Sequence, residues 1–175
     1  TIFLTNRECS FKCLMCDLWK NTTDETVPIG AIPEQIEWAL EQMPPAKHLK
    51  LYNSGSFFDK NAIPVEDYPR IAALVKNFET VIVESHTQYI GKNCLKLKAL
   101  LQPELQVALG LETVHPEVLQ KLNKKMSLDA FKNSIEFLDE NKISSRAFIL
   151  LRPPFLSEEE GIEWAEKSID FAFET

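Results

Sequence analysis

Three cysteines stand close together near the start of the chain, in the segment ECSFKCLMCD (residues 8–17). They are Cys9, Cys13 and Cys16, and the fourth cysteine, Cys94, lies far downstream. Three sulfurs in one short loop suit a shared metal better than pairwise disulfides, which are in any case rare in the reducing cytoplasm. A structural zinc site usually needs four ligands, and the run does not match the spacing of a bacterial ferredoxin. The remaining interpretation is a [4Fe–4S] cluster with three thiolate ligands and one iron left open for chemistry.

The composition is that of one globular domain that does not enter a membrane. The chain has 175 residues, of which 45% are hydrophobic and 26% are charged, and this is long enough to bury a substantial core. No apolar run reaches the length of a membrane span and no signal peptide opens the chain, so we expect a cytoplasmic protein. The net charge of −7 gives no support to a surface that holds nucleic-acid phosphates.

The rest of the chain alternates between apolar strand patterns and helical patterns, five times over. Near-continuous apolar strands between helices indicate a parallel sheet. We therefore predict an α/β fold, a partial (β/α)6-type TIM-like barrel with five βα units, although the alternation alone also fits a doubly wound sheet. The expected strands are 2–5, 48–52, 80–85, 105–112 and 145–151, and the expected helices are 33–43, 65–78, 93–101, 116–125 with 128–141, and 157–174.

Polar or unusual residues follow every one of these strands. The cysteine loop follows the first, and the segments NSGSFFD, ESH, GLET and RPPF follow the other four. Parallel α/β folds bind ligands beyond the carboxyl ends of their strands. The sequence therefore predicts one site at that edge of the sheet.

Four segments together resemble the radical SAM superfamily: TNRECSFKCLMCDLWKNT, LYNSGSFFD, GLETVHPEVLQKLNKKM and LRPPF. Within it they are similar to the branch that contains the elongator catalytic subunit and the archaeosine-synthase radical subunit. The resemblance implies that Cys9, Cys13 and Cys16 bind a [4Fe–4S] cluster and that S-adenosylmethionine chelates its open iron. Reductive cleavage would then yield a 5′-deoxyadenosyl radical, which takes a hydrogen atom from the substrate.

The resemblance also implies the setting of this chemistry. Residues 1–175 would be a radical SAM core domain, with a sixth βα unit beyond Thr175. The electron would come from a flavodoxin-like or ferredoxin-like reductant. The branch implies a tRNA base as substrate and a partner subunit, whereas the residues themselves leave a small-molecule substrate open.

Two segments that the resemblance assigns to S-adenosylmethionine depart from the usual pattern. Met15 stands where an aromatic residue is usual, and its thioether can still make an apolar contact with the adenine. The segment Asn53, Ser54, Gly55 and Ser56 stands where glycines and an acid usually meet the methionyl amine. Taken as residues alone, these four also fit a turn between a strand and a helix.

The later strand ends supply Glu84 and Ser85, then Glu112, then Arg152. The resemblance implies that residues on these strands accept from the ribose hydroxyls or the methionyl amine, and either glutamate could do so. A carboxylate buried at a strand end is costly without a partner, which favours a functional role for both. Arg152 could pair with the carboxylate of the cofactor or with Glu112 in a structural ion pair, and the sequence does not choose between them.

Three further features have simpler interpretations. We expect His86 to be a hydrogen-bonded loop residue, Cys94 to be a small buried apolar residue, and the lysine run at 121–125 to be a solvated helix end. A second class of function also stays open. In that alternative the chain is a non-enzymatic zinc-binding or Fe–S-binding α/β module.

Overall fold

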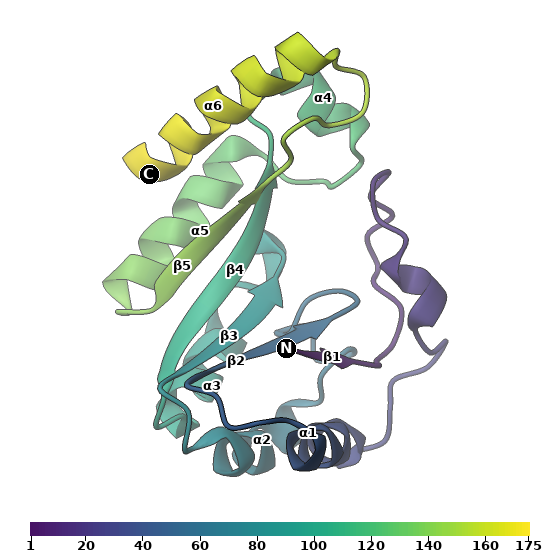
Figure 1. Cartoon of the computed structure of the whole chain (residues 1–175), viewed down its shortest axis with the longest axis vertical. Coiled ribbons are helices and arrows are strands. Elements are labelled where there is room, and N and C mark those ends of the chain that lie inside the picture. Colours follow the sequence, from purple (N-terminus) through teal and green to yellow (C-terminus); the bar gives the residue numbers. More distant parts are fainter.

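The computed structural model describes residues 1–175 and contains one sheet of five parallel strands in the order β1-β2-β3-β4-β5 (Figure 1). A doubly wound sheet reverses its strand order at a switch point, whereas a barrel keeps the order of the chain. The uninterrupted order confirms the α/β fold and favours the partial barrel over the doubly wound sheet. The strands are β1 (Ile2–Leu4), β2 (His48–Asn53), β3 (Thr80–Ser85), β4 (Glu104–Glu112) and β5 (Ser144–Ile149).

The sheet is strongly curved. Tyr52 on β2 and Phe148 on β5 lie with their ring centroids 6.2 Å apart, although β3 and β4 separate the two strands within the sheet. Two rings can meet in this way only across a concave face. The concave side therefore corresponds to the inside of a barrel that these five strands leave open.

Helices cover the outer, convex face, with α1 and α2 along the bottom of Figure 1 and α5 and α6 at its upper left. The helices are α1 (Ala31–Gln42), α2 (Tyr68–Val75), α3 (Lys92–Leu100), α4 (Pro116–Lys121), α5 (Leu128–Glu140) and α6 (Glu158–Glu174). No helix is long and apolar enough to cross a bilayer.

The core lies between this helical layer and the sheet, because alternate strand residues point outward to it. Each fully buried aliphatic side chain contributes roughly 1.5–3 kcal/mol. The buried residues on the outer face of the strands include Leu49, Leu51, Val81, Val83, Val107 and Leu109, and they belong to one cluster with Ile36, Ile71, Leu97, Phe131 and Leu138 of the helices.

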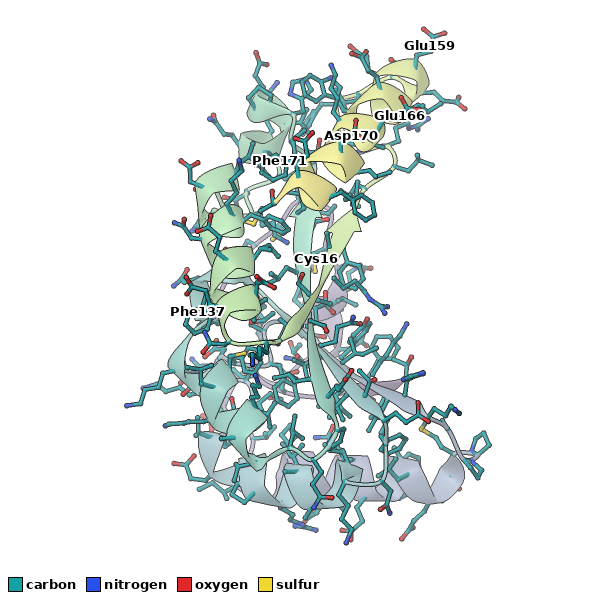
Figure 2. All side chains as sticks on the ribbon, turned by 90° about the vertical axis from the view of Figure 1, so that its left-hand side faces the viewer. Cys16, Phe137, Glu159, Glu166, Asp170 and Phe171 are labelled. Atoms are coloured by element: carbon teal, nitrogen blue, oxygen red, sulfur yellow. The ribbon has the colours of Figure 1, made fainter.

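The last helix packs through small residues. Gly161, Ala165 and Ser168 are its buried positions, and the Ser168 hydroxyl accepts a hydrogen bond from the Val114 backbone N–H at 3.0 Å. Figure 2 shows α5 and α6 together, and the acids of α6 that it labels are all exposed: Glu159, Glu166 and Asp170.

Two segments near the site differ from the sequence prediction. The helix expected over 116–125 ends at Lys121, because Asn123 and Lys125 take left-handed conformations with φ of 54° and 56°. The fifth strand ends at Ile149 rather than at residue 151. Both changes move a charged side chain relative to the edge where ligands are expected.

Candidate functional site

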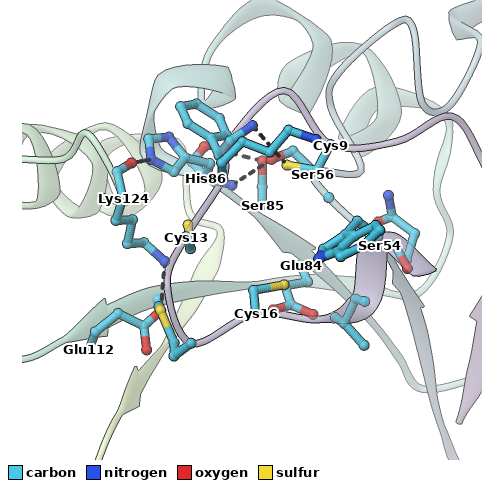
Figure 3. A pocket seen from close by; sticks show the side chains of 18 of the residues that line it. Cys9, Cys13, Cys16, Ser54, Ser56, Glu84, Ser85, His86, Glu112 and Lys124 are labelled. Carbon is cyan, nitrogen blue, oxygen red and sulfur yellow. Dashed lines mark hydrogen bonds and ion pairs between the residues drawn. The ribbon is translucent and has the colours of Figure 1, made fainter. Parts of the chain in front are cut away.

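A cavity of about 340 Å³ lies at the carboxyl ends of the first four strands, under the cysteine loop (Figure 3). Here the cysteine loop means residues 8–17, which contain no helix or strand. Four of the five predicted polar clusters therefore meet at one edge, and the segment RPPF does not take part. The lining residues are Cys9, 11–16, Leu18 and Trp19 from the N-terminal region, and 53–56, 84–86, Gly110, Glu112 and Lys124 from the strand ends and the loop after α4.

All three cysteines of the loop border this cavity, and none forms a disulfide. Burial raises the pKa of the Cys9 and Cys13 thiols above the ordinary value of 9.0, so both favour the neutral thiol until a cation compensates the thiolate. No three side chains among His, Cys, Asp and Glu stand in an arrangement that could hold a metal ion. The loop thus brings the predicted ligands to one cavity without joining them into a coordination set.

The turn after β2 lies directly against the cysteine loop. Gly55 has a φ of 144°, and a Cβ at this position would lie 3.4 Å from Cys9 Cβ and 3.7 Å from its sulfur. Asn6 reinforces the contact by donating to the Ser54 carbonyl oxygen at 3.4 Å. Glycine at residue 55 is therefore needed for conformation and close approach together.

Asn53 is the lining residue whose side chain most clearly lacks partners. It is 3% exposed, and neither its amide nitrogen nor its amide oxygen makes a hydrogen bond. A buried amide without partners costs about 1–3 kcal/mol. Such a group fits a polar ligand that enters the cavity, because the ligand would supply the missing hydrogen bonds.

The two serines that the sequence assigned to the cofactor also have structural contacts. Ser56 accepts a hydrogen bond from the His86 backbone N–H at 3.0 Å and so ties the ends of β2 and β3 together. Ser85 donates to the neighbouring His86 carbonyl oxygen at 3.3 Å. Both serines line the cavity, and Met15 and Ser54 line it as well.

Glu84 is the last residue but one of β3 and lies on the concave side of the sheet. Burial raises the pKa of its carboxyl to about 7, and the nearby Lys124 ammonium partly opposes this rise. Near physiological pH, both the neutral and the charged form of this carboxyl are therefore populated. This matches the expectation that a strand-end acid lies in the site.

Glu112 forms a buried ion pair with Lys124. The Lys124 Nζ lies 2.6 Å from Glu112 Oε1, and both side chains are 11% exposed. Gly110 makes room for the pair, because a Cβ at Gly110 would overlap both Glu112 Oε1 and Lys124 Nζ. The expectation of a solvated lysine run is wrong at residue 124, since the helix ends early and the chain turns this side chain inward.

Arg152 does not pair with Glu112 and does not line the cavity. The side chain of Arg152 is exposed and packs beside Gly161 of α6, where a Cβ would lie 3.1 Å from Arg152 Cβ. The pairing with Glu112, one of the two partners that the sequence left open for Arg152, therefore does not form, because β5 ends two residues early and the chain leaves the edge of the sheet before it reaches residue 152.

His86 is buried and hydrogen-bonded, as the sequence predicted. Its Nδ1 accepts from the Gln88 backbone N–H at 3.1 Å, so Nε2 carries the proton and donates to the Lys124 carbonyl oxygen at 3.0 Å. Burial lowers the pKa of the imidazole to about 4, which keeps the ring neutral. Phe11 of the cysteine loop stacks on it, with ring centroids 3.9 Å apart and planes at 17°.

Eight lining residues were not among the predicted site residues: Phe11, Lys12, Leu14, Leu18, Trp19, His86, Gly110 and Lys124. Asn123 offered a usable signal for the last of these, because asparagine tolerates the left-handed conformation that ends a helix. Phe11 and Gly110 carried no comparable signal, since their roles depend on contacts with residues far away in the sequence.

No family model matches the chain, but curated relatives and solved structures do. It is 29% identical to archaeosine synthase subunit beta of Thermococcus kodakarensis over 90% of this chain and 51% of that one, and 26% identical to the same subunit of Methanosarcina acetivorans over 91% and 49%. It is also 27% identical to the uncharacterized protein MJ0550 of Methanocaldococcus jannaschii over 93% and 48%. The chain therefore spans about half the length of these relatives.

The structural comparison concerns the fold alone. The cobalamin-dependent S-adenosylmethionine radical enzyme OxsB, with aqua-cobalamin and S-adenosylmethionine bound, matches with a TM-score of 0.62 and 12% identity. The match covers 97% of this chain and 26% of OxsB. The match shows that this chain shares its α/β fold with part of that enzyme.

Proposed function

We propose that the chain is the core of a radical SAM enzyme, in which Cys9, Cys13 and Cys16 hold a [4Fe–4S] cluster. The observation that carries the proposal is the convergence of three free thiols on one cavity at the carboxyl edge of a parallel sheet. When bound, the cluster would supply the electron that cleaves S-adenosylmethionine to methionine and a 5′-deoxyadenosyl radical.

The polar residues of the cavity would bind and orient S-adenosylmethionine. Asn53 has an unpartnered amide that can accept from the methionyl ammonium or donate to the carboxylate. Gly55 leaves room for a ligand to approach the backbone, and Glu84 can accept from hydroxyl groups of the ribose. Met15 offers apolar contact for the adenine. Arg152 is no part of this proposal, because it lies outside the cavity.

For the substrate we propose a base in tRNA, processed with a partner subunit and a flavodoxin-like or ferredoxin-like reductant. The support is the name that two relatives carry, archaeosine synthase subunit beta, which indicates one subunit of an assembly. A small-molecule substrate is the alternative. The action would be cytoplasmic.

Anaerobic reconstitution tests the proposal first by metal content. We expect about four iron and four sulfide per chain, whereas one zinc per chain would support the non-enzymatic module instead. Variants Cys9→Ala, Cys13→Ala and Cys16→Ala should each lose the cluster. Cys94→Ala is the matched control, because Cys94 is fully buried in the core and lies outside the cavity.

Turnover then tests the chemistry. The reconstituted protein is incubated with reductant and S-adenosylmethionine, and 5′-deoxyadenosine is measured with and without bulk tRNA. Cleavage that rises with tRNA supports the proposed substrate, and cleavage that tRNA leaves unchanged supports a small molecule. If the three cysteine variants keep the cluster and cleave S-adenosylmethionine at the normal rate, the assignment is wrong.

A further inference from the structure

Few hydrogen bonds join the centre of the cysteine loop, residues 9–16, to distant parts of the chain, and two of them go to one segment. The Leu14 backbone N–H donates to the Leu122 carbonyl oxygen at 2.9 Å. The Asn123 side-chain amide donates to the Lys12 carbonyl oxygen at 2.8 Å. Apart from these two bonds, residues 9–16 reach the distant chain by one hydrogen bond, between the hydroxyls of Ser10 and Tyr89 at 3.3 Å.

The segment 122–124 is itself fixed to the sheet. The Lys124 carbonyl oxygen accepts from His86 after β3, and the Lys124 ammonium pairs with Glu112 at the end of β4. His86 also stacks on Phe11, so the imidazole contacts the cysteine loop and the segment at once. The loop, the segment and two strand ends therefore form one connected set of contacts.

The backbone conformation in and beside the segment also indicates that its surroundings hold it in place. Asn123 and Lys125 both have φ values in the left-handed region, at 54° and 56°. Residues other than glycine adopt such conformations when their surroundings hold them there. Here the conformation ends α4 and turns Lys124 inward while it aims the Asn123 amide at the cysteine loop.

We propose that the segment 122–124 holds the cysteine loop in place over the cavity, with Asn123 and Lys124 as positioning residues. Asn123 acts on the loop directly, and Lys124 acts by fixing the segment to β3 and β4. This inference goes beyond the proposed function, because it concerns the order of the loop before any cluster binds. It is tested in the reduced, metal-free protein, so its outcome does not depend on radical chemistry.

The first test measures how fast each cysteine is alkylated in the native protein, resolved by mass spectrometry. Asn123→Gly removes the amide donor while glycine keeps the positive φ. We expect Cys9 and Cys13 to react about three- to tenfold faster, which is the range for loss of one hydrogen bond that limits local opening. Cys94 reports global unfolding in the same molecules, because it is fully buried in the core, and its rate should stay unchanged.

The second test addresses Lys124 without relying on thiol reactivity. The double variant Glu112→Gln/Lys124→Met removes the ion pair without leaving a buried charge, and it should speed amide hydrogen exchange at Leu14 about tenfold or more, since the Leu122 acceptor is no longer fixed. Amides of α3 serve as the reference for global stability, and exchange there should rise by a smaller factor. Lys125→Met is the control for both tests, because Lys125 shares the left-handed conformation but is exposed.

Two results would overturn the proposal. In the first, neither variant changes the cysteine loop more than Lys125→Met does. In the second, Cys94 and the α3 amides respond as strongly as the loop, which would mean that the segment stabilises the whole fold. A loop that loosens selectively supports the proposal, whether or not the protein later takes up iron.

Discussion

The outer layer of this molecule and the cavity edge of its sheet are built on opposite principles. Between sheet and helices, aliphatic side chains such as Leu109 are completely buried in regular elements. At the cavity edge, an irregular loop meets a buried amide without partners at Asn53, a buried ion pair, and left-handed backbone at Glu112 and Asn123. The core between sheet and helices stabilises the fold. The cavity edge holds polar groups in arrangements that lower stability and that the core compensates.

The buried ion pair is expected to be the most sensitive point of the cavity edge. Lys124→Met leaves the Glu112 carboxylate buried without its partner and should lower the free energy of unfolding by about 3–5 kcal/mol at pH 7. Chemical denaturation measures this loss. The double variant Lys124→Met/Glu112→Gln should regain part of it, and a double variant as unstable as the single one would show that packing of the lysine stem matters instead.

A cavity in the core should lower the free energy of unfolding nearly as much as loss of the ion pair does. Truncation of a side chain in the cysteine loop should hardly change it. Leu109→Ala removes a fully buried side chain and should cost about 2–5 kcal/mol of unfolding free energy. Leu14→Ala removes a side chain that is 55% exposed, so we expect a change within about 0.5 kcal/mol. Thermal and denaturant unfolding measure both changes. If Leu14→Ala lowered the free energy of unfolding as much as Leu109→Ala does, the contrast between the two regions would be wrong.

Glu84 should give the cavity edge a pH dependence that the core lacks. Its pKa is about 7 in the folded protein against 4.5 ordinarily, so the folded state binds more protons than the unfolded state between these values. Stability should therefore fall as the pH rises from about 4.5 to 7, by roughly 2 kcal/mol. Glu84→Gln should abolish this part of the fall and leave stability near pH 4 unchanged, as measured by denaturant unfolding across the pH range. If the stability of Glu84→Gln depends on pH as that of the wild type does, Glu84 is not the cause of the fall.

Substitution of Asn53 should have a small effect on stability, opposite in sign to the effects of the other substitutions. Asn53→Leu removes a buried amide that has no partner and should stabilise the free protein by about 1 kcal/mol. The same change should weaken the binding of S-adenosylmethionine to the reconstituted protein about tenfold, measured by equilibrium dialysis. If the variant is destabilised and binds normally, the amide serves the fold rather than a ligand.

The sequence predicted the regular part of the molecule well, because strand and helix periodicities are local signals. It also predicted five polar clusters at one edge, since the carboxyl ends of parallel strands share a side, and four of them line the cavity there. Lys124 and Arg152 were assigned wrongly for a common reason. In each case an element ended a few residues earlier than its pattern suggested, and tertiary contacts then decided which way a charged side chain points.

The contact between Tyr52 and Phe148 has a mechanical consequence for the cavity. Hydrogen bonds within a sheet leave its curvature free to vary, whereas two rings that touch across the concave side set a minimum radius. Asn53 directly follows Tyr52 on β2, and Phe148 pairs in register with Gly110 on β4, beneath the ion pair. An aromatic contact one layer below the cavity therefore limits how far the sheet can close around it.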